Sequence, residues 1–352
     1  MTRFRAALCV ATTLACAPAI ASAHDVNALD HAPIGVMGDH RHAKGEWMIG
    51  YRYMHMESGG TQIDTDTVDP NTIVTTVPNR FAGMPGQPPT LRVVPDSMHM
   101  DMHMAGLMYG LSDSVTLMIS GSYTSRDMDA VTYAGGMGTD VLGSNGNTVS
   151  GFGDIKAVAL VGLTDDIHLN LGVSLPTGSI TNEGTALSPM GMVMPMRLPY
   201  PMQSGSGTVD LNPGITWRGQ SDVWGWGAQA KGTIRLGTND EGYSLGDSGM
   251  TTAWIARSVS QGAALSVRLQ AETSGRIDGI DPAIMGPVQA ANPDYSGGER
   301  LFAYTGINTV ATHGPLAGWR LGAEIGVPIV QDLNGPQMAR DWMMTLGIQK
   351  SF

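Results

Sequence analysis

A strict alternation of apolar and polar residues runs through nearly all of the chain after residue 45, and it limits the fold more than any other feature. In one segment Leu265, Val267 and Leu269 alternate with Ser266 and Arg268. Successive side chains of a β-strand point to opposite faces, so such a segment forms a two-faced strand. A helix would need apolar spacings of three and four and would not tolerate 47 glycines well. The pattern therefore predicts an all-β protein.

The connections between these segments alternate in length. Short connections of 2–5 residues alternate with long ones of 11–41 residues. This rhythm is typical of a transmembrane antiparallel β-barrel with short periplasmic turns and long extracellular loops, whereas a soluble sandwich has no reason to sort its loops in this way. We predict a barrel of about 12 strands over residues 46–352. The expected strands are 46–56, 98–111, 114–125, 150–163, 167–176, 207–218, 224–237, 250–259, 263–273, 300–311, 317–329 and 341–352.

Composition supports a barrel and excludes some partners. Beyond the first twenty-odd residues, no apolar run reaches the ~18 residues that a membrane helix needs. The formal charge of −11 argues against nucleic acid as a partner. Six tryptophans lie near segment ends and are expected to form an aromatic girdle on the short-turn side. They are Trp47, Trp217, Trp224, Trp226, Trp319 and Trp342.

The amino-terminal residues have the features of an export signal. Residues 1–23 combine Arg3 and Arg5, a short apolar core and a small-residue site at 21–23, which together predict a cleaved signal peptide. Both cysteines, Cys9 and Cys16, lie in this segment, so the exported chain is expected to contain no thiol. Residues 24–45 are expected to be a periplasmic tail.

The inward face of the strands can be identified from the alternation. Charged rings set selectivity in pores, so an excess of basic over acidic residues on this face would favour anionic solutes. Alternatively, acids and bases pair across strands and fill the lumen. The expected lumen-lining residues are Arg52, Lys156, Asn170, Asp210, Gln229, Lys231, Arg235, Arg268, Glu272, Arg320 and Glu324.

Methionines spaced by two are the chain's most unusual pattern. Thioether and imidazole ligands together select Cu(I) or similar soft ions. Flexible methionines also suit a pathway for apolar molecules, and they can serve simply as apolar filler. The candidate metal ligands are Met54, His55, Met56, Met98, His99, Met100, Met102, His103 and Met104.

Two further groups of residues give weaker predictions, one of a metal site and one of a catalytic site. His24, Asp25, His31, His40 and His42 could bind a divalent metal, but a solvated tail is the preferred interpretation. A catalytic serine needs a histidine and an acid within reach, and the sequence indicates no such set, so no enzyme is expected.

Two resemblances follow from short motifs. The last strand ends at Phe352, which resembles outer-membrane barrels, whose terminal strand is read by the insertion machinery. The stretches Ser150–Lys156, Leu169–Gly178 and Gly326–Val330 resemble the outer-membrane "transporter" family named for the meta-pathway of phenol degradation. That resemblance implies a barrel that passes small solutes, apolar or aromatic ones among them, and no established substrate.

The sequence thus predicts a bacterial outer-membrane barrel that lets small solutes pass passively, with outer-membrane lipids and the insertion machinery as partners. A Met/His-rich protein that binds a copper-like ion is the first alternative, and no other cofactor is indicated. A lipid-directed barrel enzyme is the second. Solute identity, transport direction and oligomeric state are not encoded in any pattern that we find.

Overall fold

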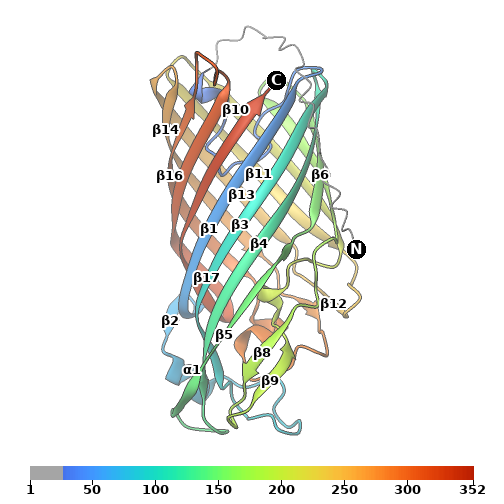
Figure 1. Ribbon diagram of the computed structural model, residues 1–352, viewed down its shortest axis with the longest axis vertical. Coiled ribbons are helices and arrows are strands. Elements are labelled where there is room, and N and C mark those ends of the chain that lie inside the picture. The colour runs from blue at the N-terminus through green and yellow to red at the C-terminus, as the bar shows by residue number, and fades with distance from the viewer. Residues whose placement is uncertain (1–26) are drawn as a thin grey trace, which may run out of the picture.

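The protein is a closed antiparallel β-barrel (Figure 1). The computed structural model describes residues 27–352, so the expected signal peptide lies outside the described residues. Each barrel strand pairs with its two neighbours, and β17 pairs with β1 to close the sheet. Among the described residues, no helix is long and apolar enough to cross a membrane.

Eleven strand elements form the wall. Their order round the barrel is that of the chain, as expected for hairpin-connected strands. They are β1 (Trp47–Asp64), β3 (Val93–Ser112), β4 (Val115–Tyr133), β6 (Ile155–Gly162), β7 (Ile167–Leu175), β10 (Val209–Gln220), β11 (Trp224–Leu236), β13 (Ser248–Ser260), β14 (Ala263–Ser274), β16 (Gly298–Val310) and β17 (Trp319–Ser351).

The last element, β17, crosses the wall twice. Its residues 320–333 pair antiparallel with β16, and its residues 337–351 pair antiparallel with β1. A closed sheet with only antiparallel pairs needs an even number of passes, so β17 must double back, and Gly335 at φ 75° lies between its halves. Ten single passes and two from β17 make twelve, which confirms the prediction.

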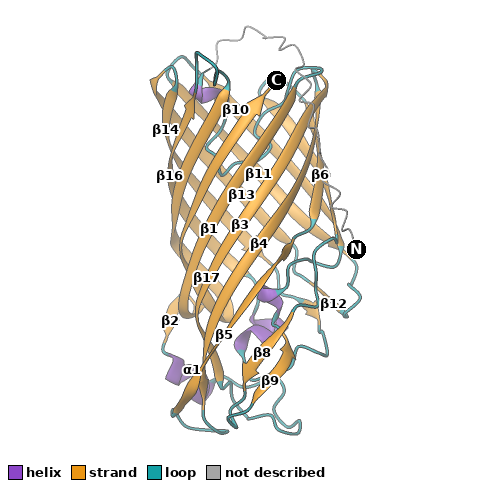
Figure 2. Cartoon of the chain, in the orientation of Figure 1, coloured by secondary structure: helices purple, strands orange, loops and turns teal. Residues whose placement is uncertain are grey.

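The predicted sorting of connections by length is confirmed except at the last hairpin, where the connection expected to be long consists only of residues 334–336. Short turns lie at the end that carries the carboxyl terminus, whereas the long loops gather at the opposite end with their own small elements (Figure 2). In the first long loop, Ile73 and Val74 of α1 (Pro70–Thr76) are fully buried against Leu91 and Tyr133. The remaining elements are β2 (Asp66–Val68), β5 (Val141–Phe152), β8 (Glu183–Leu187), β9 (Val193–Arg197), β12 (Tyr243–Ser244), β15 (Asp278–Gly279) and the 3₁₀ turns η1 (Ala28–Asp30), η2 (Tyr200–Met202), η3 (Gln289–Ala291) and η4 (Pro293–Tyr295).

One predicted strand, 150–163, is divided in the structure. Its first residues end β5, which pairs only with β4, and the wall resumes at β6 after Gly153 and Asp154. The Asp154 carboxylate accepts hydrogen bonds from the backbone of Gly178 (2.9 Å) and of Ser206 (2.9 Å). Hydrogen bonds from the long loops therefore hold the Asp154 side chain, and the predicted strand is interrupted at this residue.

The outer face of the barrel is apolar and the inner face polar. On β14, Val267 is 56% exposed whereas its neighbours Ser266 and Arg268 are 6% and 4% exposed. This inversion is what a bilayer requires, because lipid contacts every second side chain.

The aromatic girdle has five of its six expected members on the short-turn side. Trp47, for example, packs on Tyr109 with ring centroids 4.5 Å apart. Trp342 is the exception, because it pairs with Glu57 and lies 5.1 Å from the His55 ring, in the half of β1 nearer the long loops. The predicted edge for Trp342 was wrong, because the strand over 337–351 begins at the end of the barrel opposite the short turns.

Candidate functional site: the barrel lumen

Residues 27–46, the described part of the segment before β1, lie inside the barrel, which corrects the solvated tail expected there. They are held by side chains from opposite sides of the wall, from β16, β17 and β1 on one side and from β11 on the other. The backbone carbonyls of this irregular segment need donors, and inward polar side chains supply them. The donor–acceptor distances are Arg320 Nη1 to Asn27 O 2.8 Å, Asn308 Nδ2 to Ala32 O 2.9 Å, Arg52 Nε to Ile34 O 2.9 Å and Gln229 Nε2 to Met37 O 3.1 Å.

A third expected cation and an ion pair also hold these residues, called the lumenal segment (residues 27–46) from here on. Lys231 Nζ donates to the Met37 carbonyl, and Arg320 Nη2 forms an ion pair with Asp30 at 3.0 Å. Asn170 reaches the same region by donating to Thr216 (2.8 Å), which also accepts from Gln229 (2.9 Å). The segment therefore fills the lumen next to the short turns.

The remaining charged lumenal residues mostly pair with one another. Arg268 donates to Glu324 through Nε (2.9 Å) and Nη2 (2.6 Å), and Arg235 pairs with Asp210 at 2.5 Å. Glu272 pairs with Arg340 at 2.8 Å. These contacts correspond to the interpretation in which acids and bases pair across strands. Lys156 points inward between the buried Ser120 and Ser174, to which it is directly paired.

A cavity of about 920 Å³ lies in the half of the barrel nearer the long loops. Lys231, Met250, Glu272 and Arg300 line it, and they are successive partners along one row of paired positions on β11, β13, β14 and β16. The cavity thus adjoins the filled portion of the lumen at Lys231.

The methionines form a continuous wall on the inward face of β1 and β3. Met54 is directly opposite Met102, and Met56 is opposite Met100 on one side and Met343 of β17 on the other. Met98 is opposite Met128, and Met98, Met196 and Met338 all pack against the buried cluster that contains Met128. Met104 is opposite Arg52. Met338 and Met343 did not belong to the predicted set, because their spacing of five conceals a shared face.

The imidazoles of the predicted metal set lie on the opposite, outer face. His55 contacts Asp101 (Nδ1, 2.8 Å) and Glu57 (Nε2, 2.9 Å), and His99 contacts the same glutamate. His103 Nδ1 lies 2.7 Å from the Tyr51 hydroxyl. The wall therefore separates these histidines from the thioethers, and the combined Met/His site predicted from sequence is wrong.

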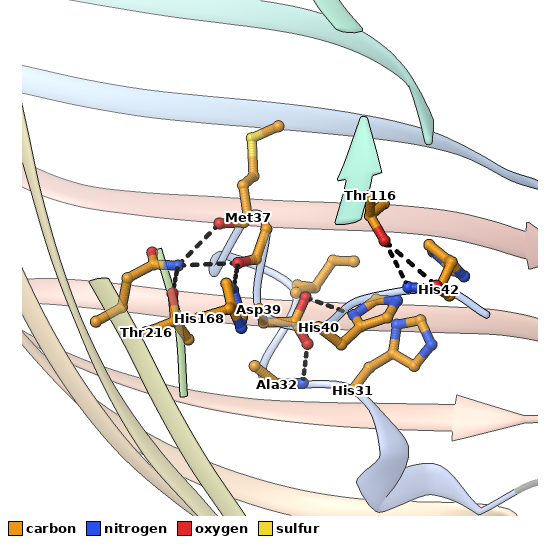
Figure 3. Close-up of polar contacts among 12 residues, drawn as sticks. His31, Ala32, Met37, Asp39, His40, His42, Thr116, His168 and Thr216 are labelled. Atoms are coloured by element: carbon orange, nitrogen blue, oxygen red, sulfur yellow. Dashed lines mark hydrogen bonds and ion pairs between the residues drawn. The ribbon is translucent and has the colours of Figure 1, made fainter. Parts of the chain in front are cut away.

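Another histidine cluster lies within the lumenal segment, where His31, Asp39 and His40 come together (Figure 3). The His31 and His40 rings are 4.0 Å apart, and the His40 and His42 rings 4.8 Å apart. Burial lowers the pKa of His31 well below its usual range and lowers the pKa of His40. Burial alone would raise the pKa of Asp39, but the charge and hydrogen bond of His40 hold it well below its ordinary value.

Comparison with solved structures identifies the fold. An outer-membrane channel from Pseudomonas putida F1 superposes with a TM-score of 0.56 at 14% identity, covering 90% of this chain and 99% of that chain. A FadL homologue from Pseudomonas aeruginosa (TM-score 0.44, 9% identity, 88% and 90% covered) and the P. putida toluene transporter TodX (0.42, 10%, 88% and 91%) score lower. No family model and no curated protein matches the chain.

Proposed function

We propose that this protein is an outer-membrane barrel through which small solutes, apolar and aromatic ones among them, pass down their own gradient. The similar structure from P. putida is described as an outer-membrane channel, and the apolar outer face suits the same membrane. The signal peptide expected at residues 1–23 would direct export. Phe352, whose backbone bonds to Trp47 close the barrel, would present the last strand to the insertion machinery.

The inward methionine wall is the observation that carries this proposal. A lumen for ions alone has no need of adjacent thioethers such as Met54, Met56, Met100 and Met102, which offer no charge and few hydrogen bonds. Methionine is flexible and polarizable, so the wall can adapt to apolar molecules of different shape. The cavity nearer the long loops would receive the solute, and the lumenal segment would have to move before the solute could pass.

Uptake measurements test this role. In cells lacking general porins, we expect the barrel to raise the initial uptake rate of radiolabelled benzyl alcohol. Met100→Glu combined with Met102→Glu puts two charges on the methionine wall and should return the rate toward that of cells without the protein. The matched control is Met190→Glu combined with Met192→Glu, because these methionines have the same spacing but are exposed in a long loop. Equal rates for both double variants would contradict the proposal.

A second candidate function, binding of Cu(I), is favoured by the contiguity of Met56, Met100 and Met343. Thioethers select soft ions without help from imidazole. The double variant Met100→Leu with Met102→Leu keeps the wall apolar but removes two sulfur ligands. Unchanged benzyl alcohol uptake with weaker Cu(I) binding would assign the wall to both roles, whereas unchanged Cu(I) affinity would eliminate the metal role. We propose no catalytic role.

A further inference from the structure

Three ligand groups converge in the lumenal segment without serving the barrel wall. One ligand atom from each of His31, Asp39 and His40 lies within 4.8 Å of the others, and Asp39 and His40 are buried. The carboxylate of Asp39 is oriented by the backbone N–H of Ala32 at 2.7 Å and contacts His40 Nδ1 at 2.9 Å. This set is spaced so that small side-chain rotations could bring its donors around one ion, since metal–nitrogen bonds are about 2.0–2.1 Å.

Two buried histidine nitrogens in this segment are available to bind a ligand. His40 Nε2 and His42 Nε2 are both buried, and neither has a hydrogen-bond partner within residues 27–352. Buried polar atoms are normally satisfied, so each such atom calls for an explanation. The His42 ring has the arrangement of metal-binding histidines, in which a carboxylate holds one nitrogen and the other is free to ligate, because Glu46 contacts its Nδ1 at 3.2 Å. The Asp39 carboxylate, which contacts His40 Nδ1, would instead turn toward the ion as a ligand.

We infer that His31, Asp39 and His40 form a binding site for one divalent transition-metal ion of the Zn²⁺ type, with His42 beside it as a fourth donor. Imidazole nitrogens with one carboxylate suit zinc and its neighbours better than Ca²⁺ or Mg²⁺, which prefer oxygen ligands alone. The nearby cation Arg320 is already paired with Asp30, so the ion would not meet an isolated positive charge.

An ion at this position would link His31 to Asp39 and His40, and so would join the two ends of the turn formed by residues 32–38. His31 precedes the turn and Asp39 and His40 follow it, while the carbonyls of Met37 and Gly38 between them accept from Lys231 and Gln229. The Gly38 carbonyl also lies 2.9 Å from His168 Nε2 (Figure 3). Metal binding would therefore hold these carbonyls against strands β7 and β11. The inference concerns the site itself and does not depend on which solute the barrel passes.

Calorimetric titration with Zn²⁺ tests the site in the full-length barrel, purified in detergent without a histidine tag and treated with a chelator. We expect one Zn²⁺ per chain and no binding of Ca²⁺ or Mg²⁺. His31→Gln with His40→Gln should weaken Zn²⁺ binding by about 100-fold or more, since loss of an outer partner alone costs about 10–100-fold. Co²⁺ in place of Zn²⁺ should give visible absorption that the double variant lacks.

Matched variants separate this site from others. His99→Gln with His103→Gln removes two histidines from the outer face of β3 and should leave Zn²⁺ binding unchanged, as should the Met100→Leu and Met102→Leu pair. Asp39→Asn keeps the shape of its side chain, which guards against misfolding, and should weaken binding; heat-modifiable migration on gels reports folding. If the wild-type chain binds Zn²⁺ no more tightly than the folded lumenal variants, the site does not exist.

Discussion

Arg268 of β14 reaches across β16 to Glu324 of β17 and forms two hydrogen bonds with it inside the barrel, at 2.9 and 2.6 Å. The guanidinium also lies 3.8 Å from the ring centre of Tyr304, the residue between them. Both charged side chains are almost fully buried, so each depends on the other for compensation of its charge. Such a pair ties three strands of the wall together.

We predict that Glu324→Ala destabilises the barrel by about 3–5 kcal/mol, because it leaves Arg268 buried without a counter-charge. Urea unfolding followed by tryptophan fluorescence measures the change. The control is Asp294→Ala, which breaks the exposed Arg80–Asp294 pair and should cost less than about 1 kcal/mol. The double change Arg268→Met with Glu324→Leu should recover much of the loss. Equal small effects of Glu324→Ala and Asp294→Ala would mean that water reaches the pair.

A disulfide is expected to lock the lumenal segment in place. A Cβ atom at Gly225 of β11 would lie 3.7 Å from the Leu29 Cβ, within the 3.5–4.5 Å range usual for disulfides. The only natural cysteines, Cys9 and Cys16, lie in the expected signal peptide, so Leu29→Cys with Gly225→Cys introduces a single pair. In planar bilayers, the oxidised variant should conduct less than the same protein after reduction. A conductance that is high and indifferent to reduction would show that the segment does not obstruct the lumen.

The opposite effect is expected from a side chain that displaces the segment. A Cβ at Gly322 would lie 2.6 Å from the Ile34 Cβ, closer than such atoms approach, so Gly322→Val should force the lumenal segment away and raise conductance. Gly121→Val is the control, because a Cβ there meets only Ile155 at 4.0 Å. Conductance is measured in the same bilayers for both variants. If Gly322→Val conducts no more than wild type, the segment can shift without opening a path.

Lipid contact at the outer face can be tested at Val267. This residue is central in β14 and 56% exposed, so Val267→Arg should destabilise the barrel in bilayers by about 2–4 kcal/mol. Val193→Arg, at a residue 63% exposed in a long loop, should be neutral. Unfolding from lipid vesicles compares the two. Neutral behaviour at Val267 would place this surface outside the hydrocarbon layer.

Period-two patterning was sufficient to predict the barrel, its twelve passes and the inward direction of side chains such as Arg268 and Lys231. These properties are local, because a strand alternates its faces wherever it lies and a bilayer imposes the sorting of apolar residues on every strand alike. The separation of the methionines from His55, His99 and His103 also follows from odd and even positions along β1 and β3, which the combined Met/His prediction overlooked.

The lumenal segment was decided only by the tertiary structure. Residues 27–46 have no strand period, and nothing local shows that their carbonyls match donors as distant in sequence as Gln229 and Arg320. The gathering of His31, Asp39 and His40 follows from that placement, because the lumen buries Asp39 and His40 and brings His31 beside them. Alternation records which face of a strand a residue occupies, whereas what fills a closed barrel depends on contacts that form only after the sheet has closed.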